Sequence, residues 1–216
     1  YCYYLEKSKL YDDNKNHVIT DALLEKFIKE YIEAQTTPQV LFTWHGGETL
    51  MRPISFYRRA LELQRYYARG RQIDNSIQTN GVLLNDEWCR FFKENNFLVG
   101  VSIDGPQEFH DEYRRNAMGK PSFHQVMKGI NLLNKHGVEW NALAVVNDFN
   151  ADYPLDFYHF FKEIGCRYIQ FTPIVERIVD RNDGLTLAPG MQEGGELTDF
   201  SVTAEQWGNF LCTIFD

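Results

Sequence analysis

The chain has 216 residues and a formal net charge of −8, with 44% hydrophobic and 24% charged residues. These values are those of a globular domain with a core of its own, and they exclude a fibrous or low-complexity chain. The sequence has no long apolar run that could cross a membrane, and no basic stripe of the kind that binds nucleic acid.

The predicted elements alternate between helices and strands. In chain order they are a helix over 21–34, a strand over 39–44, a helix over 53–68, a strand over 73–79, a helix over 85–95, a strand over 97–103, a helix over 122–137, a strand over 138–146, a helix over 155–164, a strand over 167–172, and a last helix from 203 onward. Ser122 with Gln125, and Thr203 with Gln206, have the spacing of capping boxes.

Alternation of this kind predicts an α/β fold with a parallel sheet and right-handed crossovers. The helix over 21–34 has no strand before it, and the last helix has no stop signal. We therefore expect a partial (βα)6 barrel that lacks its first strand, in a chain cut at both ends. A doubly wound open sheet is the alternative.

The four cysteines, Cys2, Cys89, Cys166 and Cys212, are far apart and show no paired spacing. The start of the chain is aromatic and charged and has no secretory signal. We expect a reducing, cytoplasmic location, with Cys89, Cys166 and Cys212 buried as small hydrophobic side chains.

Polar residues and glycines follow each predicted strand. In barrels the active site lies at the carboxyl ends of the strands. The segments found there are His45-Gly46-Gly47-Glu48-Thr49, Gln78-Thr79-Asn80-Gly81, Ser102-Ile103-Asp104-Gly105-Pro106, Asn147-Asp148 and Thr172-Pro173-Ile174-Val175-Glu176. Together they predict a site for a polar small molecule.

These segments also have simpler interpretations. Glycine pairs and Asn-Gly are common turns, and His45, His110 and His124 are typical of surface or capping positions. Glu48 and Asp104 could form the carboxylate pair of a glycoside hydrolase barrel. The rim could also belong to a binding barrel without catalytic activity.

The order of the turns resembles the radical S-adenosylmethionine (SAM) superfamily. Tyr1-Cys2 resembles the aromatic residue and last cysteine of its cluster loop, and Gly46-Gly47-Glu48 resembles its Gly-Gly-Glu motif, with Thr49 where proline is common. Within the superfamily, the chain resembles anaerobic sulfatase-maturating enzymes through TWHGGETL, IQTNGVLLND, VGVSIDGPQEFHDEYR and YIQFTPIVER.

The resemblance implies site residues and cofactors. Cys2 would be a ligand of a [4Fe-4S] cluster, with two further cysteines before Tyr1. SAM would be bound through the Gly46-Gly47-Glu48 motif and by residues matching contact positions, namely Tyr1, Gly47, Ser102, Arg114 and Val175. With only Cys2 of the three cysteines, this chain alone is not expected to hold a complete cluster.

The resemblance also implies a reaction. A radical generated from SAM would oxidise a cysteine or serine of a sulfatase polypeptide to formylglycine, with electrons from a donor such as a flavodoxin or ferredoxin. Auxiliary clusters and the catalytic base are expected in an extension beyond Asp216. A thioether-forming maturase is the nearest alternative, and the choice between cysteine and serine stays open.

Overall fold

The structure is a computed structural model that describes residues 18–116, 118–176 and 197–216. Its elements are α2 (Asp21–Ala34), β1 (Gln39–Trp44), the 3-10 helix η2 (Thr49–Met51), α3 (Ile54–Tyr67), β2 (Gln72–Thr79), α4 (Asp86–Glu94), β3 (Leu98–Ser102), α5 (Gln107–Tyr113), α6 (Phe123–His136), β4 (Trp140–Val146), α7 (Pro154–Glu163), β5 (Ile169–Pro173) and α8 (Ala204–Phe215). No helix in these ranges is both long and apolar enough to cross a bilayer.

The sheet has five strands in the order β1-β2-β3-β4-β5. Pairing is parallel between β1 and β2, β2 and β3, and β4 and β5, with Gln39 opposite Gln72 and Ala142 opposite Ile169. A sequential order is that of a (βα) barrel, in which each strand lies beside the next. A doubly wound sheet would reverse its order at a switch point, so that alternative is wrong.

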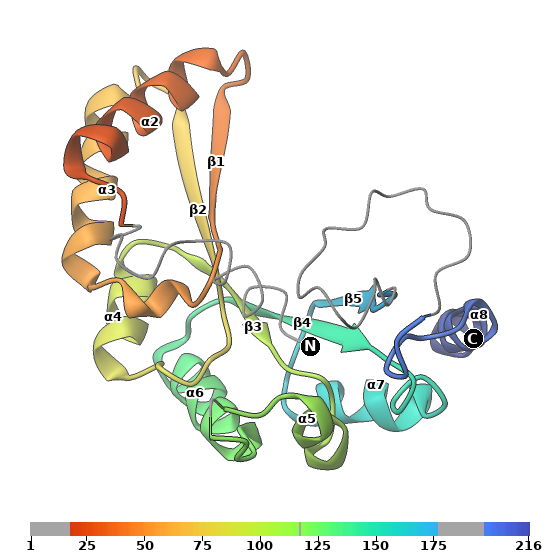
Figure 1. Ribbon diagram of the computed structural model, residues 1–216. Coiled ribbons are helices and arrows are strands. Elements are labelled where there is room, and N and C mark those ends of the chain that lie inside the picture. Colours follow the sequence, from red (N-terminus) through yellow and green to blue (C-terminus); the bar gives the residue numbers. More distant parts are fainter. Residues whose placement is uncertain (1–17, 117, 177–196) are drawn as a thin grey trace, which may run out of the picture. The chain divides into compact units, whose positions relative to one another are not determined.

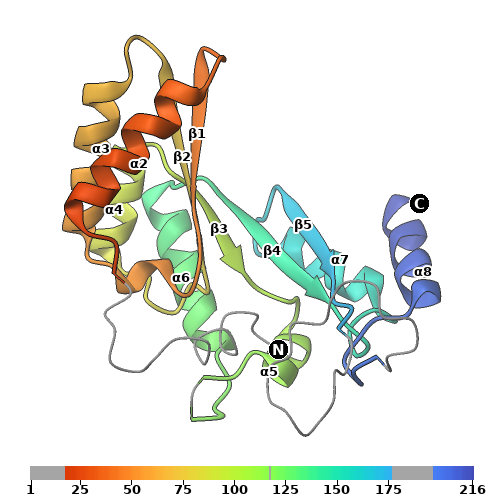
Figure 2. The same cartoon turned by 45° about the horizontal axis from the view of Figure 1, so that its top comes forward.

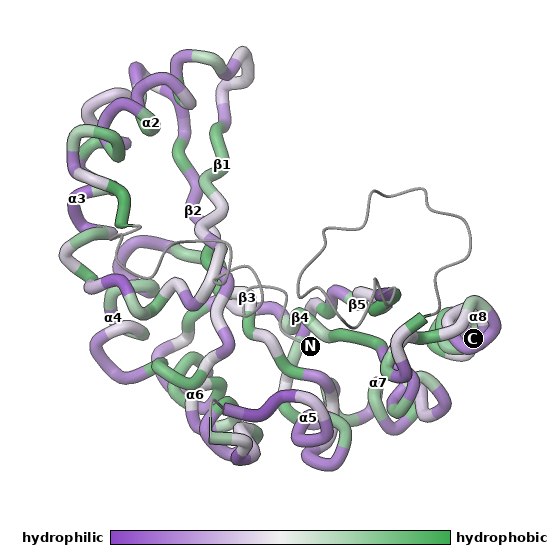
Figure 3. The backbone as a smooth tube through the Cα atoms, viewed as in Figure 1, coloured by the Kyte–Doolittle hydropathy of each residue, from purple (hydrophilic) through white to green (hydrophobic). Residues whose placement is uncertain are grey.

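The chain divides into two compact units. The first, here the β1–β3 unit, comprises Leu10–Val101 and Met127–Trp140. Helices α2 and α3 lie side by side over β1 and β2 (Figures 1 and 2). Their inner faces and β1 form one buried apolar cluster of Leu24, Ile28, Ile32, Val40, Phe42, Ala60 and Leu63. Hydrophobic and hydrophilic residues accordingly alternate along both helices (Figure 3).

The second unit, here the β4–β5 unit, includes Ser102–Val126 and Asn141–Asp216. Its core is aromatic: the ring of Phe157 lies 5.8 Å from that of Phe171 and 5.7 Å from that of Phe210, measured between centroids. Each fully buried phenylalanine contributes about 1.5–3 kcal/mol to folding. This packing joins α7, β5 and α8.

Several local signals act as predicted. The side chain of Asn85 caps α4 by accepting from the backbone N–H of Trp88 at 2.9 Å. Thr203 and Gln206 form the predicted capping box of α8. The short helices η2 and α5 were not predicted; both lie in the segments that follow strands, where the site is expected.

Candidate functional site

Gly46 and Gly47 follow β1 in backbone conformations that favour glycine. Their φ values are +107° and +57°, a region that costs an L-residue conformational energy. Among the residues that the structure describes, nothing lies within 4 Å of a Cβ placed on either glycine, and both residues are exposed. The turn therefore presents bare backbone that a ligand can approach closely.

Glu48 fastens this turn to the end of β2. Its carboxylate accepts from the backbone N–H of Leu50 at 3.0 Å, the hydroxyl of Thr79 at 2.6 Å and the backbone N–H of Asn80 at 2.9 Å. The Thr79 hydroxyl in turn accepts from the backbone N–H of Gly81 at 3.1 Å. The side chain of Glu48 thus shapes the turn, while the two glycines stay exposed.

Thr49 strengthens the same connection. Its buried hydroxyl donates to the carbonyl of Gln78 at 2.6 Å, and its own carbonyl accepts from the hydroxyl of Tyr57 at 2.9 Å. Proline, the residue common at this position of the motif, has no hydroxyl. Threonine replaces the rigidity of a proline ring with a hydrogen bond between the ends of β1 and β2.

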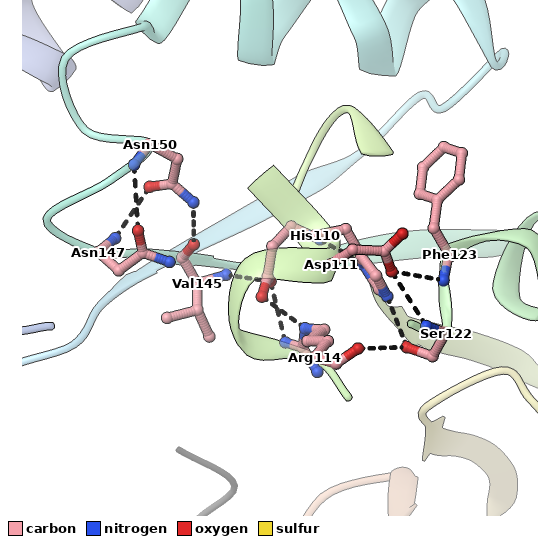
Figure 4. A network of polar contacts seen from close by, with 9 residues as sticks. His110, Asp111, Arg114, Ser122, Phe123, Val145, Asn147 and Asn150 are labelled. Atoms are coloured by element: carbon pink, nitrogen blue, oxygen red, sulfur yellow. Dashed lines mark hydrogen bonds and ion pairs between the residues drawn. The ribbon is translucent and has the colours of Figure 1, made fainter. Parts of the chain in front are cut away.

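Asp104 and Arg114 form an ion pair just beyond β3. Arg114 Nε and Nη2 donate to the two carboxylate oxygens at 2.5 and 2.9 Å, and the backbone N–H of Val145 donates to Asp104 at 2.8 Å (Figure 4). The side chain of Asp104 is 1% exposed and that of Arg114 is 20% exposed. A ligand can therefore reach the arginine but not the carboxylate.

This geometry argues against a glycoside hydrolase. That chemistry needs one carboxyl group to donate a proton to substrate and a second to act on the other face of the sugar. Asp104 is buried and ion-paired, and Glu48 accepts three hydrogen bonds from its own chain. Neither carboxylate is placed for that reaction.

His110 is not the surface or capping histidine predicted above. It lies on α5 and is fully buried. Its Nδ1 accepts from the backbone N–H of Asp104 at 3.3 Å, which makes Nε2 the protonated nitrogen, and Nε2 lies 3.0 Å from the hydroxyl oxygen of Ser122. Burial, and then the nearby charge of Arg114, lower the pKa of His110 to about 3, so the imidazole is neutral. His45 and His124 are exposed, as predicted.

Ser122 is at the start of α6, as predicted, but its hydroxyl is used differently from a capping box. It donates to the carbonyl of Arg114 at 2.8 Å. The backbone N–H groups of Ser122 and Phe123 instead donate to the carboxylate of Asp111, at 3.0 and 2.9 Å. The start of α6 is thereby tied to α5 (Figure 4).

The other predicted site residues lie as follows. Ser102 ends β3 and is half-buried, and Val175, just after β5, is 58% exposed. Tyr1 and Cys2 lie outside the described residues. Gly46, Gly47 and Glu48 belong to the β1–β3 unit, whereas Ser102, Arg114 and Val175 belong to the β4–β5 unit.

Within the described ranges, no group of three or more His, Cys, Asp or Glu side chains could hold a metal ion. Cys89 is buried, and burial raises the pKa of its thiol to about 11. Cys166 is half-buried. Cys212 is exposed, contrary to prediction, because it lies two residues beyond the buried Phe210 and so on the other side of α8.

Comparison with known proteins identifies the family to which the chain belongs. Residues 1–161 match the radical SAM superfamily. The chain is 76% identical, over its whole length, to a serine-type anaerobic sulfatase-maturating enzyme of Bacteroides thetaiotaomicron, of which it covers 52%. It is 34% identical, again over its whole length, to a cysteine-type anaerobic sulfatase-maturating enzyme of Clostridium novyi, of which it covers 54%.

A solved structure agrees with the sequence comparison. Native anSMEcpe with bound AdoMet and Cp18Cys peptide matches with a TM-score of 0.81 at 29% identity, over 94% of this chain and 53% of that one. The chain thus spans about half the length of the proteins that it matches.

Proposed function

This chain belongs to the radical SAM superfamily, and we propose that the protein containing it is a serine-type anaerobic sulfatase-maturating enzyme. The observation that carries the proposal is the 76% identity to a serine-type enzyme over the entire chain, against 34% to a cysteine-type one. The proposed reaction oxidises a serine side chain in a sulfatase polypeptide to the aldehyde of formylglycine.

The residues of the chain fit SAM. The open backbone of Gly46 and Gly47 can meet its amino group, and the partly exposed guanidinium of Arg114 can meet its carboxylate. Ser102 offers a hydroxyl and the exposed Val175 an apolar surface for adenine. Tyr1 is proposed as a further contact from the family resemblance alone. Cys2 would supply one thiolate to the [4Fe-4S] cluster.

When bound, the cluster and SAM supply the one-electron chemistry that removes a hydrogen atom from the substrate. The chain itself binds and orients. Glu48 holds the turn that carries Gly46 and Gly47 against the end of β2, through hydrogen bonds of 2.6–3.0 Å. The ligand then meets a backbone whose conformation is already fixed, which lowers the entropy lost on binding.

The proposal extends to the rest of the protein. Residues 1–216 form part of the barrel, and a C-terminal domain with auxiliary clusters carries the catalytic base. A flavodoxin or ferredoxin supplies the electrons. The cytoplasm is the proposed location, because a reducing compartment protects the cluster and its thiolate ligands.

The test uses the full-length protein, reconstituted anaerobically with iron and sulfide. It is incubated with SAM, a low-potential reductant and a sulfatase-derived peptide that contains Ser-x-Pro-x-Arg. We expect the serine peptide to lose two hydrogen atoms, and its product to react with a hydrazine reagent because it carries an aldehyde. Mass spectrometry detects both changes.

Two matched peptides sharpen the result. The same peptide with alanine in place of the serine should stay unchanged, and the cysteine version should be converted more slowly than the serine version. A product of the cysteine peptide that loses two hydrogen atoms, keeps its sulfur and carries no aldehyde would support the thioether-forming alternative. Faster conversion of the cysteine peptide would contradict the serine-type assignment.

A further inference from the structure

Arg114 is fixed at both ends by buried groups. At one end its guanidinium makes a bidentate pair with Asp104, with contacts of 2.5 and 2.9 Å. At the other end its carbonyl accepts from the hydroxyl of Ser122 at 2.8 Å, and its backbone N–H donates to the carbonyl of His110 at 2.9 Å. An exposed ion pair usually contributes little, whereas the carboxylate of this pair is buried.

The groups that hold Arg114 are themselves anchored. Asp104 follows β3 directly and accepts from the backbone N–H of Val145 on β4 at 2.8 Å. His110 connects the two ends of the arrangement, because it accepts from the backbone N–H of Asp104 and donates to Ser122. Asp104 and His110 are both fully buried. His110 and Val145 lie within α5 and β4, and the network ties to them the segments that hold Asp104, Arg114 and Ser122, just after β3, just after α5 and just before α6.

Burying the charged and polar groups of this network costs free energy of folding. A buried carboxylate needs an opposite charge and several donors to be tolerated, and a buried neutral histidine needs partners for both nitrogens. Apolar residues of the same volume often give equal or greater stability than a buried ion pair. What the pair does provide is direction: a bidentate contact fixes the plane of the guanidinium.

We propose that Asp104 positions Arg114 for the carboxylate of SAM, and that His110 and Ser122 hold the backbone end of the same arginine. The inference rests on the proposed function, in which Arg114 contacts SAM. Asp104 is shielded from the ligand, whereas Arg114 is partly exposed, so these three residues act through the arginine. They are positioning residues. Because folding already orders Arg114, less conformational entropy is lost when SAM binds.

A competing electrostatic effect of Asp104 predicts the opposite change in SAM affinity. The charge of Asp104 also neutralises Arg114 and so weakens its attraction for an anion. If neutralisation dominated, removing the charge of Asp104 would tighten SAM binding. If orientation dominates, as proposed, the same change weakens binding, because the guanidinium is no longer held in one plane.

The experiment measures SAM affinity in the full-length protein with its cluster in place, by equilibrium dialysis without turnover. We expect Asp104→Asn to raise the dissociation constant for SAM by about tenfold, the effect of losing one well-oriented bond to a charged group. Affinity for methylthioadenosine should stay unchanged, because it keeps the adenosine of SAM but has a neutral thioether in place of the sulfonium and lacks the amino and carboxylate groups. Tighter or unchanged SAM binding by folded Asp104→Asn would overturn the proposal.

A double-mutant cycle separates this inference from the proposed role of Arg114. Arg114→Gln alone should also weaken SAM binding by at least about tenfold. In the Arg114→Gln background, Asp104→Asn should have no further effect, because Asp104 acts only through the arginine. If Arg114→Gln leaves affinity unchanged, the assumed SAM contact is wrong. If Arg114→Gln weakens binding and Asp104→Asn does not, only the positioning role fails.

Two further variants guard against a general loss of structure. Ser122→Ala removes one hydroxyl and tests the backbone end; it should weaken SAM binding about threefold in the parent and not in Arg114→Gln. This variant decides the question if Asp104→Asn does not fold. Gln64→Met is the matched control, since it breaks a buried pair of 2.9 Å hydrogen bonds with Asn75 in the β1–β3 unit. It should lower stability and leave SAM affinity unchanged.

Discussion

At the scale of single residues, His110 makes the stability of the chain depend on pH. Its pKa is 6.5 in an unfolded chain and about 3 in the folded one. Between these pH values the unfolded state binds more protons than the folded state. The contribution of His110 to stability is therefore fully present above pH 6.5 and is lost as the pH falls. The slope approaches about 1.4 kcal/mol per pH unit. His110→Gln cannot titrate and should remove this slope between pH 6.5 and 5, as measured by urea unfolding.

A second histidine controls for this effect. His159 is exposed on α7, so His159→Gln should leave the pH dependence as it is in the parent. An unchanged slope in His110→Gln, or an equal loss of slope in both variants, would show that another group carries the dependence.

The residue contacts that build the site are those that sequence reasoning could not supply. The turn glycines were predicted, because positive φ and glycine go together. The partners of Glu48 were not, since Thr79 is 31 residues away and only the pairing of β1 with β2 brings it near. Arg114 and Asp104 were both singled out from the sequence, yet their pairing depends on how α5 turns back after β3. Contacts between side chains at the ends of different strands depend on the tertiary structure, which the local sequence pattern does not reveal.

At the scale of elements, two helical glycines should respond to alanine with opposite sign. Gly208 lies inside α8, and no residue in the described part of the chain comes within 4 Å of its Cβ position, so Gly208→Ala should stabilise by about 0.5–1 kcal/mol. Gly129 lies inside α6, where a Cβ would be 2.5 Å from the carbonyl oxygen of Gly81 and 2.9 Å from Leu84. Overpacking costs about 1–3 kcal/mol, which exceeds the gain in helix propensity, so Gly129→Ala should destabilise.

Thermal unfolding of the two variants checks both signs. The midpoint should rise for Gly208→Ala and fall for Gly129→Ala. A rise in both would mean that α6 can move away from the turn after β2 at no cost, in contradiction to the close packing seen there.

Elements were predicted best where the pattern was long. The helix over 21–34 and the strand over 39–44 coincide with α2 and β1, because periodicity over several turns and a clear apolar face identify them. Helix α5 was missed because it has only seven residues, too few for a periodic face to stand out, and it begins beside Pro106 in what was interpreted as a turn. Helix α5 carries His110 and leads into Arg114, so the sequence pattern did not predict the element that orders this part of the candidate site.

At the scale of the whole molecule, the predicted SAM contacts fall in both compact units. Gly46 and Gly47 belong to the β1–β3 unit, and Ser102 and Arg114 to the β4–β5 unit. If one SAM molecule contacts all four residues, its binding must stabilise both units by linkage. A ligand that used only one set of residues would slow exchange chiefly in the unit that holds them.

Amide hydrogen exchange of the full-length protein distinguishes these cases, with and without SAM at equal cluster occupancy. We expect slower exchange in peptides that contain Gly46 and Gly47, and also in those that contain Ser102 and Arg114. In Arg114→Gln, at a SAM concentration that saturates the parent but not the variant, protection should fall in both places together, because each reports the same bound fraction. Protection confined to one unit would mean that the residue-by-residue transfer of the family's site to this chain is wrong for the other.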